Sequence, residues 1–256
     1  MVEVLFERPD FNKLRGKFVC DMHIHSKYTD GWNTPREMLG VAREKGIFIA
    51  ITDHNSIRAA RELKDEQDVI FGIEAHSREG PHFLLYFSSF GELENFYNAC
   101  IKPNKSRDPI SRLKLGIERL IKLAKSYGAV VAVAHPTGPL WFNLAKKTNS
   151  NVLSKLDALE VISGLQSRNI DKKALKLAYE YSLGMIGGSD AHSKADVGRV
   201  VTYSDASTID EFLHDIKNKK TSVVGTEVSL SKRPRQIIKT FRAHIKHTIR
   251  HTLGKK

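Results

Sequence analysis

Four short apolar runs of this chain each end in histidine, and three of them also carry aspartate near that end. They occupy residues 18–25, 47–54, 129–135 and 185–192. Short runs rich in β-branched residues are typical of buried strands. In sheets of parallel strands, functional side chains gather where the strands end. Four predicted strands that each end in histidine therefore indicate a single site. The imidazole and carboxylate groups at these strand ends predict a centre with more than one metal ion.

The rest of the pattern predicts an α/β fold, because strand-like runs alternate with helical patterns along the chain. Thr34 and Pro35 are expected to open a helix that ends at Gly46. Further helices are predicted at residues 56–66, 92–100, 110–127, 171–181 and 207–218. Further strands are predicted at residues 69–73, 82–87, 129–134, 158–162, 184–187, 199–203 and 222–224. A distorted or incomplete β/α barrel is the favoured architecture, and a flat doubly wound sheet is the alternative.

Composition narrows the class of protein. A chain of 256 residues with 41% hydrophobic and 27% charged residues suits one soluble α/β domain. Two cysteines, Cys20 and Cys100, predict neither a disulfide framework nor a cysteine-rich zinc site. No secretory apolar core and no membrane-spanning run is evident, so a cytoplasmic enzyme is the expectation.

The basic character of the chain is concentrated in residues 232–256. This segment holds nine Lys or Arg and no Asp or Glu, so the net charge of +12 falls to +3 for residues 1–231. The segment is predicted to be an amphipathic helical tail with the apolar stripe Ile238, Phe241, Ile245, Ile249 and Thr252. It could pack on the body or on a partner, or bind nucleic acid, with a membrane as the least favoured option.

The candidate metal ligands are nine histidine and carboxylate residues at or beside the strand ends. His23 and His25 are two residues apart, so strand alternation puts them on one face, and Asp190 and His192 repeat this spacing. A single buried histidine is more often structural, but the joint pattern favours metal. The nine are His23, His25, Asp30, His54, Glu74, His82, His135, Asp190 and His192. This number exceeds the need of one tetrahedral ion and predicts two or three divalent ions, either zinc, manganese or iron.

Five motifs in order along the chain resemble those of the PHP family, named for polymerase and histidinol phosphatase. They are Asp21-Met-His-Ile-His-Ser26, Thr52-Asp-His54, Gly72-Ile-Glu74, Ala134-His-Pro136 and Gly188-Ser-Asp-Ala-His192. The resemblance spans residues 17–225. It implies a distorted seven-stranded β/α barrel in residues 1–231 that holds two or three metal ions and cleaves phosphate esters. The loop Ser26–Gly31 and the strand that opens at His82 resemble the branch of the nucleoside-bisphosphate phosphatase and 5′–3′ exonuclease.

The resemblance also implies how the ligands divide among the ions. The first ion would take His23, His25, Glu74 and Asp190. The second would share Glu74 and add His82 and His135, and the third would use Asp30, His54 and His192. His76 is interpreted as an extra ligand, a substrate contact or, preferably, a hydrogen-bonded neighbour. Asp53 is expected to point away from the site.

The reaction expected from the resemblance is attack of a metal-bridging hydroxide on the phosphorus of an ester. Arg199 is a candidate catalytic and substrate-binding residue that would hold a phosphate, with a salt bridge at the barrel rim as its alternative role. His192 or a metal-bound water would protonate the leaving group. The expected substrate is a small phosphorylated metabolite, a nucleotide or an oligonucleotide.

Three other functions stay open at this stage. The chain could be a histidinol phosphatase, or a metal-containing accessory module for nucleic acid or a polymerase. Metal-dependent C–N hydrolysis is disfavoured because no lysine ends a predicted strand. The short segment between Glu74 and His135 leaves little room for the inserted domain of the exonuclease branch, which weakens the case for a long substrate.

Overall fold

A computed structural model describes residues 2–105, 111–138 and 150–228. Within these residues, one sheet contains ten strands in the order β1-β10-β9-β2-β3-β4-β5-β6-β7-β8. The strands are β1 (Val4–Leu5), β2 (Phe18–Ile24), β3 (Phe48–Ile51), β4 (Val69–His76), β5 (His82–Phe87), β6 (Val130–Val133), β7 (Ala158–Ser163), β8 (Gly184–Gly188), β9 (Val200–Ser204) and β10 (Ser222–Gly225).

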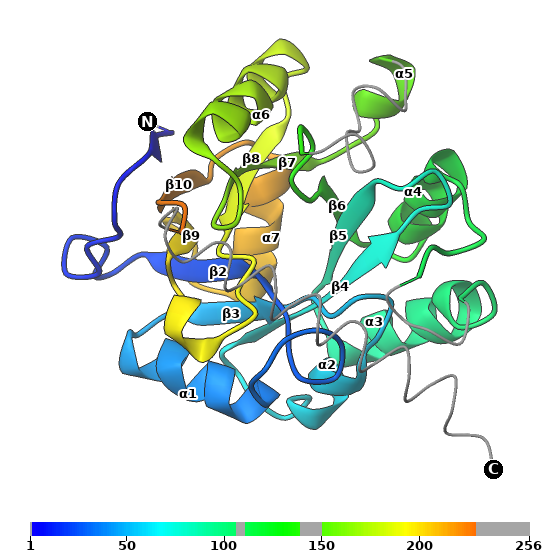
Figure 1. The fold of residues 1–256 in the computed structure, drawn as a ribbon, viewed down its shortest axis with the longest axis horizontal. Coiled ribbons are helices and arrows are strands. Elements are labelled where there is room, and N and C mark those ends of the chain that lie inside the picture. Colours follow the sequence, from blue (N-terminus) through cyan, green and yellow to red (C-terminus); the bar gives the residue numbers. More distant parts are fainter. Residues whose placement is uncertain (1, 106–110, 139–149, 229–256) are drawn as a thin grey trace.

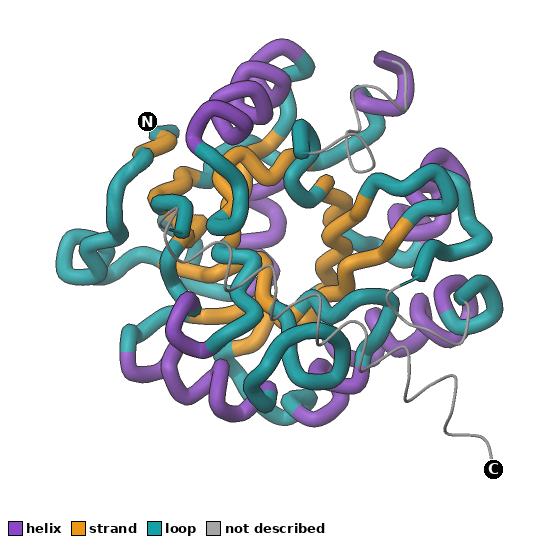
Figure 2. Tube along the Cα trace, viewed as in Figure 1, coloured by secondary structure: helices purple, strands orange, loops and turns teal. Residues whose placement is uncertain are grey.

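Strands β2 to β8 curl into an incomplete barrel, as the sequence predicted (Figures 1 and 2). The barrel closes where the residues after β8 return to β2. Ile24 and Ala191 form an isolated parallel bridge, and the amide of His25 donates to the carbonyl of Ala191 at 2.9 Å. Gly188 permits this approach, because a Cβ at that position would lie 2.3 Å from the Cβ of His23. We call this contact of β2 with the end of β8 the seam.

The direction of β5 explains why His82 begins a strand whereas the other predicted ligands lie near strand ends. β2, β3 and β4 are parallel, and so are β6, β7 and β8, but β5 is antiparallel to both β4 and β6. The first residue of β5 therefore lies at the rim where the parallel strands end. The register pairs His82 with His76 across β4 and β5.

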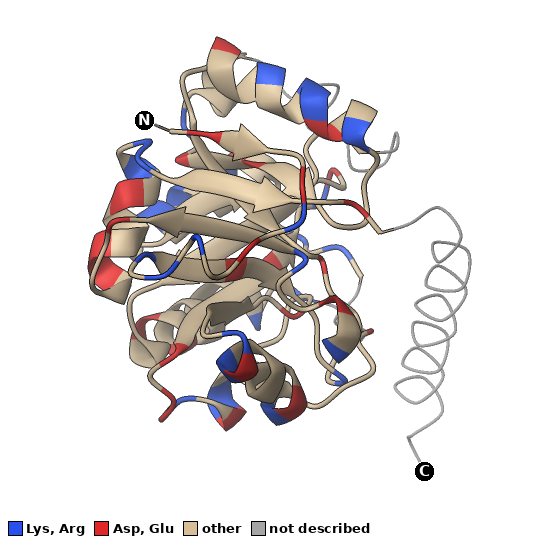
Figure 3. Ribbon diagram, turned by 90° about the vertical axis from the view of Figure 1, so that its left-hand side faces the viewer, with Lys and Arg blue, Asp and Glu red and all other residues tan. Residues whose placement is uncertain are grey.

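Helices cover the outside of the curled sheet and carry many charged residues (Figures 1 and 3). They are α1 (Pro35–Glu44), α2 (Arg58–Glu62), α3 (Phe90–Phe96), α4 (Ile117–Ser126), α5 (Ser150–Leu153), α6 (Arg168–Glu180) and α7 (Ile209–Lys217). A π-helical turn, η1 (Tyr97–Ile101), continues α3, and a 3₁₀ turn, η3 (Lys194–Asp196), precedes β9. The predicted start of α1 is confirmed, since Thr34 and Glu37 form a reciprocal capping box.

The helix predicted from residue 110 is shorter in the structure, where α4 begins at Ile117. Tertiary contacts hold the preceding segment in another conformation: the amide of Leu113 donates to the carbonyl of His76, and that of Arg78 donates to Leu115. Backbone groups engaged in this way cannot form the first turns of a helix. Residues 106–110 lie outside the described ranges.

The end of the barrel opposite the histidines is filled by apolar side chains. Phe18, at the start of β2, stacks on Phe212 of α7 with ring centroids 4.5 Å apart. Met22 and Ile186 belong to the same buried cluster, which α7 completes with Leu213 and Ile216. Because α7 covers this end, the histidine rim is the polar end of the barrel.

The predicted basic tail, residues 232–256, lies outside the described residues. Among the helices of the described ranges, none combines the length and the hydropathy that crossing a membrane requires. Cys20 and Cys100 are both buried and are not joined in a disulfide.

Candidate metal centre

All nine predicted ligands lie at the histidine rim of the barrel, and each is at most 9% exposed. They come from the end of β2 and the loop after it, from the residues after β3, β6 and β8, from β4, and from the first residue of β5. Groups up to 169 positions apart in the chain are thus brought into one buried cluster.

The first predicted group, around His23 and His25, is compact. The two Nε2 atoms are 3.0 Å apart. His25 Nε2 lies 3.2 Å from Asp190 Oδ1 and 3.3 Å from Glu74 Oε2. His23 Nε2 lies 3.5 Å from the same oxygen of Glu74. Two imidazoles and two carboxylates therefore face one point.

The second predicted group uses the other oxygen of Glu74. His82 Nδ1 lies 2.7 Å from Glu74 Oε1, and His135 Nε2 lies 3.5 Å from it. The two oxygens of Glu74 thus face different sets of histidines. A carboxylate placed in this way could donate one oxygen to each of two ions, and the sharing of Glu74 stays a prediction.

The third predicted group centres on Asp30, in the loop after β2. Its Oδ2 atom lies 3.2 Å from His54 Nε2 and 3.1 Å from His192 Nε2. The other ring nitrogen of His192 faces the backbone carbonyl of Asp190 at 2.9 Å. Both nitrogens of His192 are therefore engaged.

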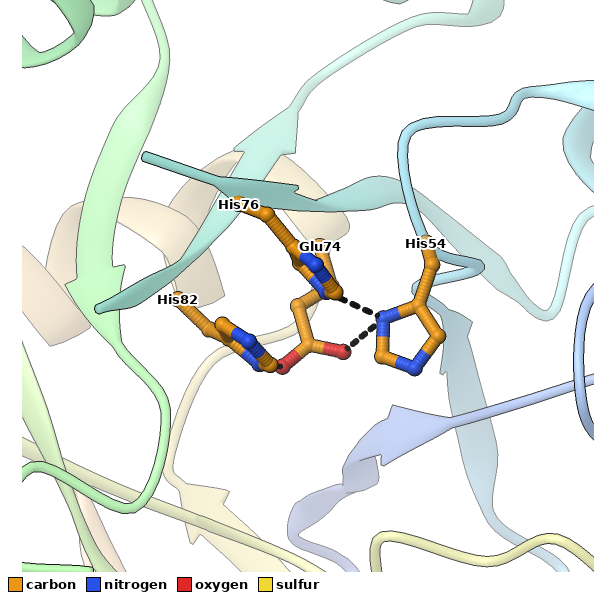
Figure 4. A group of neighbouring side chains, drawn as sticks. All are labelled: His54, Glu74, His76 and His82. Carbon is orange, nitrogen blue, oxygen red and sulfur yellow. Dashed lines mark hydrogen bonds and ion pairs between the residues drawn. The ribbon is translucent and has the colours of Figure 1, made fainter. Parts of the chain in front are cut away.

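His76 lies between the second and third groups (Figure 4). Its Nε2 atom is 2.7 Å from His54 Nδ1, and its ring stacks on that of His82 with centroids 3.6 Å apart and planes inclined by 8°. The structure thus shows the hydrogen-bonded neighbour that the sequence favoured. His76 also joins His54, Glu74 and His82 in a group whose donor atoms all lie within 4.8 Å of one another.

The donor set fits divalent metal ions. It consists of imidazole nitrogens and carboxylate oxygens, which suit zinc, manganese and iron. His25 Nδ1 and Asp30 Oδ1 are buried, make no hydrogen bond within the described residues, and face each other at 3.8 Å. That separation is too long for a hydrogen bond but suits two ligands of one ion, whose bonds are about 2.0–2.2 Å long.

Charges within the cluster compensate for burial. Burial alone would raise the pKa of Glu74, but the charges of His54 and His82 hold it well below its usual value. Burial alone would lower the pKa of His192, but Asp30 raises it to about 9. Burial and the charges of His82 and His54 hold the pKa of His76 well below its usual value. Ionised carboxylates thus concentrate negative charge where histidine protons or divalent ions can neutralise it.

Two of the predicted ligands have strained backbones. His135 has φ of 32° and Asp190 has φ of 49°, in the left-handed region that non-glycine residues seldom adopt. Such conformations cost free energy and persist where the surrounding structure enforces them, which is common at functional sites.

Solved structures with a similar fold include a predicted PHP-like phosphoesterase and a lesion-specific endonuclease. A two-domain protein from Bacteroides vulgatus that contains a predicted PHP-like metal-dependent phosphoesterase has a TM-score of 0.61 and 18% identity, over 94% of this chain and 74% of that chain. The lesion-specific endonuclease PfuEndoQ from Pyrococcus furiosus has a TM-score of 0.66 and 21% identity, over 81% and 57%. A complex of Endonuclease Q with a 27-mer duplex that carries an abasic lesion has a TM-score of 0.68 and 20% identity, over 82% and 60%.

Sequence comparison adds a relative and a family model. The uncharacterised protein MJ1587 of Methanocaldococcus jannaschii is 31% identical over 138 residues, which are 47% of this chain and 69% of the relative. A family model described as PHP-associated matches residues 171–221, a segment that includes Asp190 and His192. In the match to this family model and in its fold, the chain is similar to proteins of the PHP family.

Sequence reasoning missed one buried acid of this PHP barrel, Glu160 in β7. Its Oε1 atom lies 3.0 Å from His23 Nδ1, and its Oε2 atom accepts from the amide of His135 at 2.7 Å. A carboxylate at this position keeps a proton on His23 Nδ1, so that Nε2 presents its lone pair to the first group. The sequence feature that could have indicated Glu160 is its position as a single acidic residue within the apolar run 158–163.

Two further aspartates position the loops of the PHP centre. Asp53, expected to point away from the site, accepts from the amide of Ser26 at 2.7 Å and from Thr29 Oγ1 at 2.8 Å. Asp21 accepts from the amides of Ser189 at 2.8 Å and Gly198 at 2.7 Å. Asp21 alternates with His23 in the sequence, but the register of β2 shifts between Asp21 and Ile24, so strict alternation does not hold there.

Arg199 lies beside a separate hollow of the PHP barrel. Its Nη2 atom makes the salt bridge that the sequence left as one alternative, 2.8 Å from Asp196 Oδ1. The hollow has a volume of about 250 Å³ and is also lined by Arg8 and Lys45, but by none of the nine predicted ligands. A role of Arg199 toward a substrate stays a prediction.

Proposed function

We propose that the protein is a metal-dependent phosphoesterase that binds two or three divalent ions at the histidine rim. The observation that carries this proposal is the convergence of the nine predicted donors into three groups, each with at least one carboxylate. The similarity in fold to PHP-like proteins and to Endonuclease Q supports it.

Bound divalent ions would supply the chemistry that phosphate-ester hydrolysis needs, by lowering the pKa of water and neutralising charge on the phosphate. The protein residues hold the donors in place. Glu160 orients His23, and Glu74 joins the first group to the second. Because both ring nitrogens of His192 are engaged, its geometry supports a role as a ligand over a role as proton donor.

The substrate class that we propose first is a phosphorylated small molecule or nucleotide. Cleavage of nucleic acid is a second candidate, supported by the similarity in fold to a lesion-specific endonuclease and by the net charge of +12. Most of that charge lies in residues 232–256, and we propose that this segment contacts nucleic acid. Histidinol phosphate is a third substrate to compare.

Turnover of p-nitrophenyl phosphate with and without manganese tests the proposed activity. We expect turnover that a chelator abolishes and that manganese, zinc or iron restores. A panel of histidinol phosphate, a 3′,5′-bisphosphonucleotide, 5′-phosphorylated RNA and a duplex with an abasic site then identifies the substrate class. Absence of turnover on the whole panel in protein that binds metal would favour the accessory-module alternative instead.

A further inference from the structure

His76 is placed by the hairpin of β4 and β5. The antiparallel register sets it opposite His82, and their rings stack with centroids 3.6 Å apart. Glu74 lies two residues earlier in the same strand, so alternation turns it to the same side. Figure 4 shows the three side chains pointing toward one region, with His54 on its other side.

The nitrogen that His76 presents there is Nε2. It lies 2.7 Å from His54 Nδ1, which is also 2.7 Å from Glu74 Oε2. His76 Nε2 and His54 Nδ1 form a hydrogen bond in this structure, so an ion bound by His76 would replace that bond. The His76 side chain is 4% exposed, and its donor atom belongs to the same buried group as those of Glu74 and His82.

We propose that His76 is a metal ligand, and that it binds the ion held by Glu74, His82 and His135. This inference rests on the proposed metal centre and deepens it. The donor atoms of Glu74, His76 and His82 lie within 4.8 Å of one another. Ligand bonds of about 2.0–2.2 Å place two donors about 3.3 Å apart around a tetrahedral ion. Because an imidazole binds metal in the plane of its ring, the stacked rings of His76 and His82 would have to tilt apart when the ion binds.

The added ligand has a chemical consequence. With His76, the second ion has four ligands from the protein, one of them a carboxylate and three of them imidazoles. Structural zinc sites are closed in this way, whereas catalytic sites keep one position open. The second ion is therefore the most tightly held, and His54, through Nε2, belongs to the ion beside Asp30.

The test compares the metal content of the wild-type chain with that of His76→Ala and His76→Asn after dialysis against a weak chelator. Elemental analysis is combined with the absorption spectrum of the cobalt-substituted proteins. We expect each variant to lose about one ion per chain, together with the tetrahedral cobalt band. His76→Asn keeps a side chain that can hydrogen-bond to His54, so full metal content in this variant would overturn the inference.

Two further proteins complete the design. His214→Ala is the matched control, because His214 lies on the exposed surface of α7 and bonds to Asn218. His76→Asp supplies a carboxylate ligand and should recover the lost ion, and a failure to recover it counts against the inference. Phosphoesterase turnover of the wild type is measured in parallel. Its absence in metal-loaded protein would contradict the proposed function, whereas the metal content of the His76 variants would still decide whether His76 is a ligand.

Discussion

Glu160 accepts a hydrogen bond from His23, with Oε1 3.0 Å from Nδ1 and both side chains fully buried. The carboxylate lies behind the imidazole, on the side away from the other ligands of the first group. Hydrogen bonds of this kind fix the tautomer of a metal-binding histidine and raise its basicity. We therefore expect the metal affinity of the centre to depend on Glu160, although Glu160 is not one of the proposed ligands.

Replacing Glu160 with Gln should weaken metal binding by about 10- to 100-fold, because an amide holds the His23 tautomer less strongly than a carboxylate does. Titration of the metal-depleted protein with a fluorescent competitor measures the affinity, and circular dichroism checks the fold. Glu94→Gln is the control, since Glu94 pairs with Arg61 at the surface. Equal affinity of the Glu160→Gln protein and the wild type would contradict this role.

Replacing His25 or Asp190 with Ala should remove metal from the first group and lower phosphoesterase turnover by roughly 100-fold or more, because several kcal/mol of charge stabilisation depend on the ions. Turnover and metal content are measured on the same preparations, with the exposed Asp65→Ala as control. A His25→Ala protein with full metal content and full turnover would show that the centre lies elsewhere.

Metal affinity should rise with pH between about 6 and 9, since histidine must lose its proton to become a ligand. Asp30 raises the pKa of His192 to about 9, so this histidine holds a proton at neutral pH when no ion displaces it. Binding of an ion then releases protons, which makes the binding constant increase as the pH increases. Calorimetry in buffers of different ionisation enthalpy counts the protons, and a count of zero would refute the assignment of His192.

Replacing Gly188 with Ala should destabilise the protein by about 1–3 kcal/mol or prevent closure of the seam, because the new Cβ overlaps His23. Gly40→Ala is the matched control. Gly40 lies within α1 with no atom near the position of a Cβ, so alanine there should raise the free energy of unfolding by about 0.4–1 kcal/mol. Urea unfolding measures both changes, and equal values for the two variants would argue against a crowded seam.

Removing residues 232–256 should weaken nucleic-acid binding and flatten its dependence on salt, because nine cationic side chains are lost and residues 1–231 carry a net charge of only +3. Fluorescence anisotropy with a labelled oligonucleotide at two salt concentrations measures both effects. Turnover of p-nitrophenyl phosphate should be retained, which separates the tail from the metal centre. An unchanged salt dependence would mean that the segment does not contact the nucleic acid.

The metal centre was largely predictable because its histidines follow strands that end at one rim. Alternation correctly placed His23 and His25 together, and the ligand motifs identified the PHP barrel. The reversal of β5 was not visible in the pattern, although it explains why His82 opens a strand. The pairing of Asp21 with Ser189 and Gly198 and that of Glu160 with His23 join residues far apart in the sequence, and alternation within one strand gives no reason to expect such contacts.

The seam has a consequence for how the barrel holds its shape. On one side of it stand His23 and His25, and on the other side stand Asp190 and His192, so the proposed first ion takes ligands from both sides of the contact between β2 and the end of β8. An ion bound there acts as a removable cross-link between segments that the chain separates widely. Opening of the barrel would then require release of that ion, and the supply of metal would influence the stability of the fold as well as its chemistry.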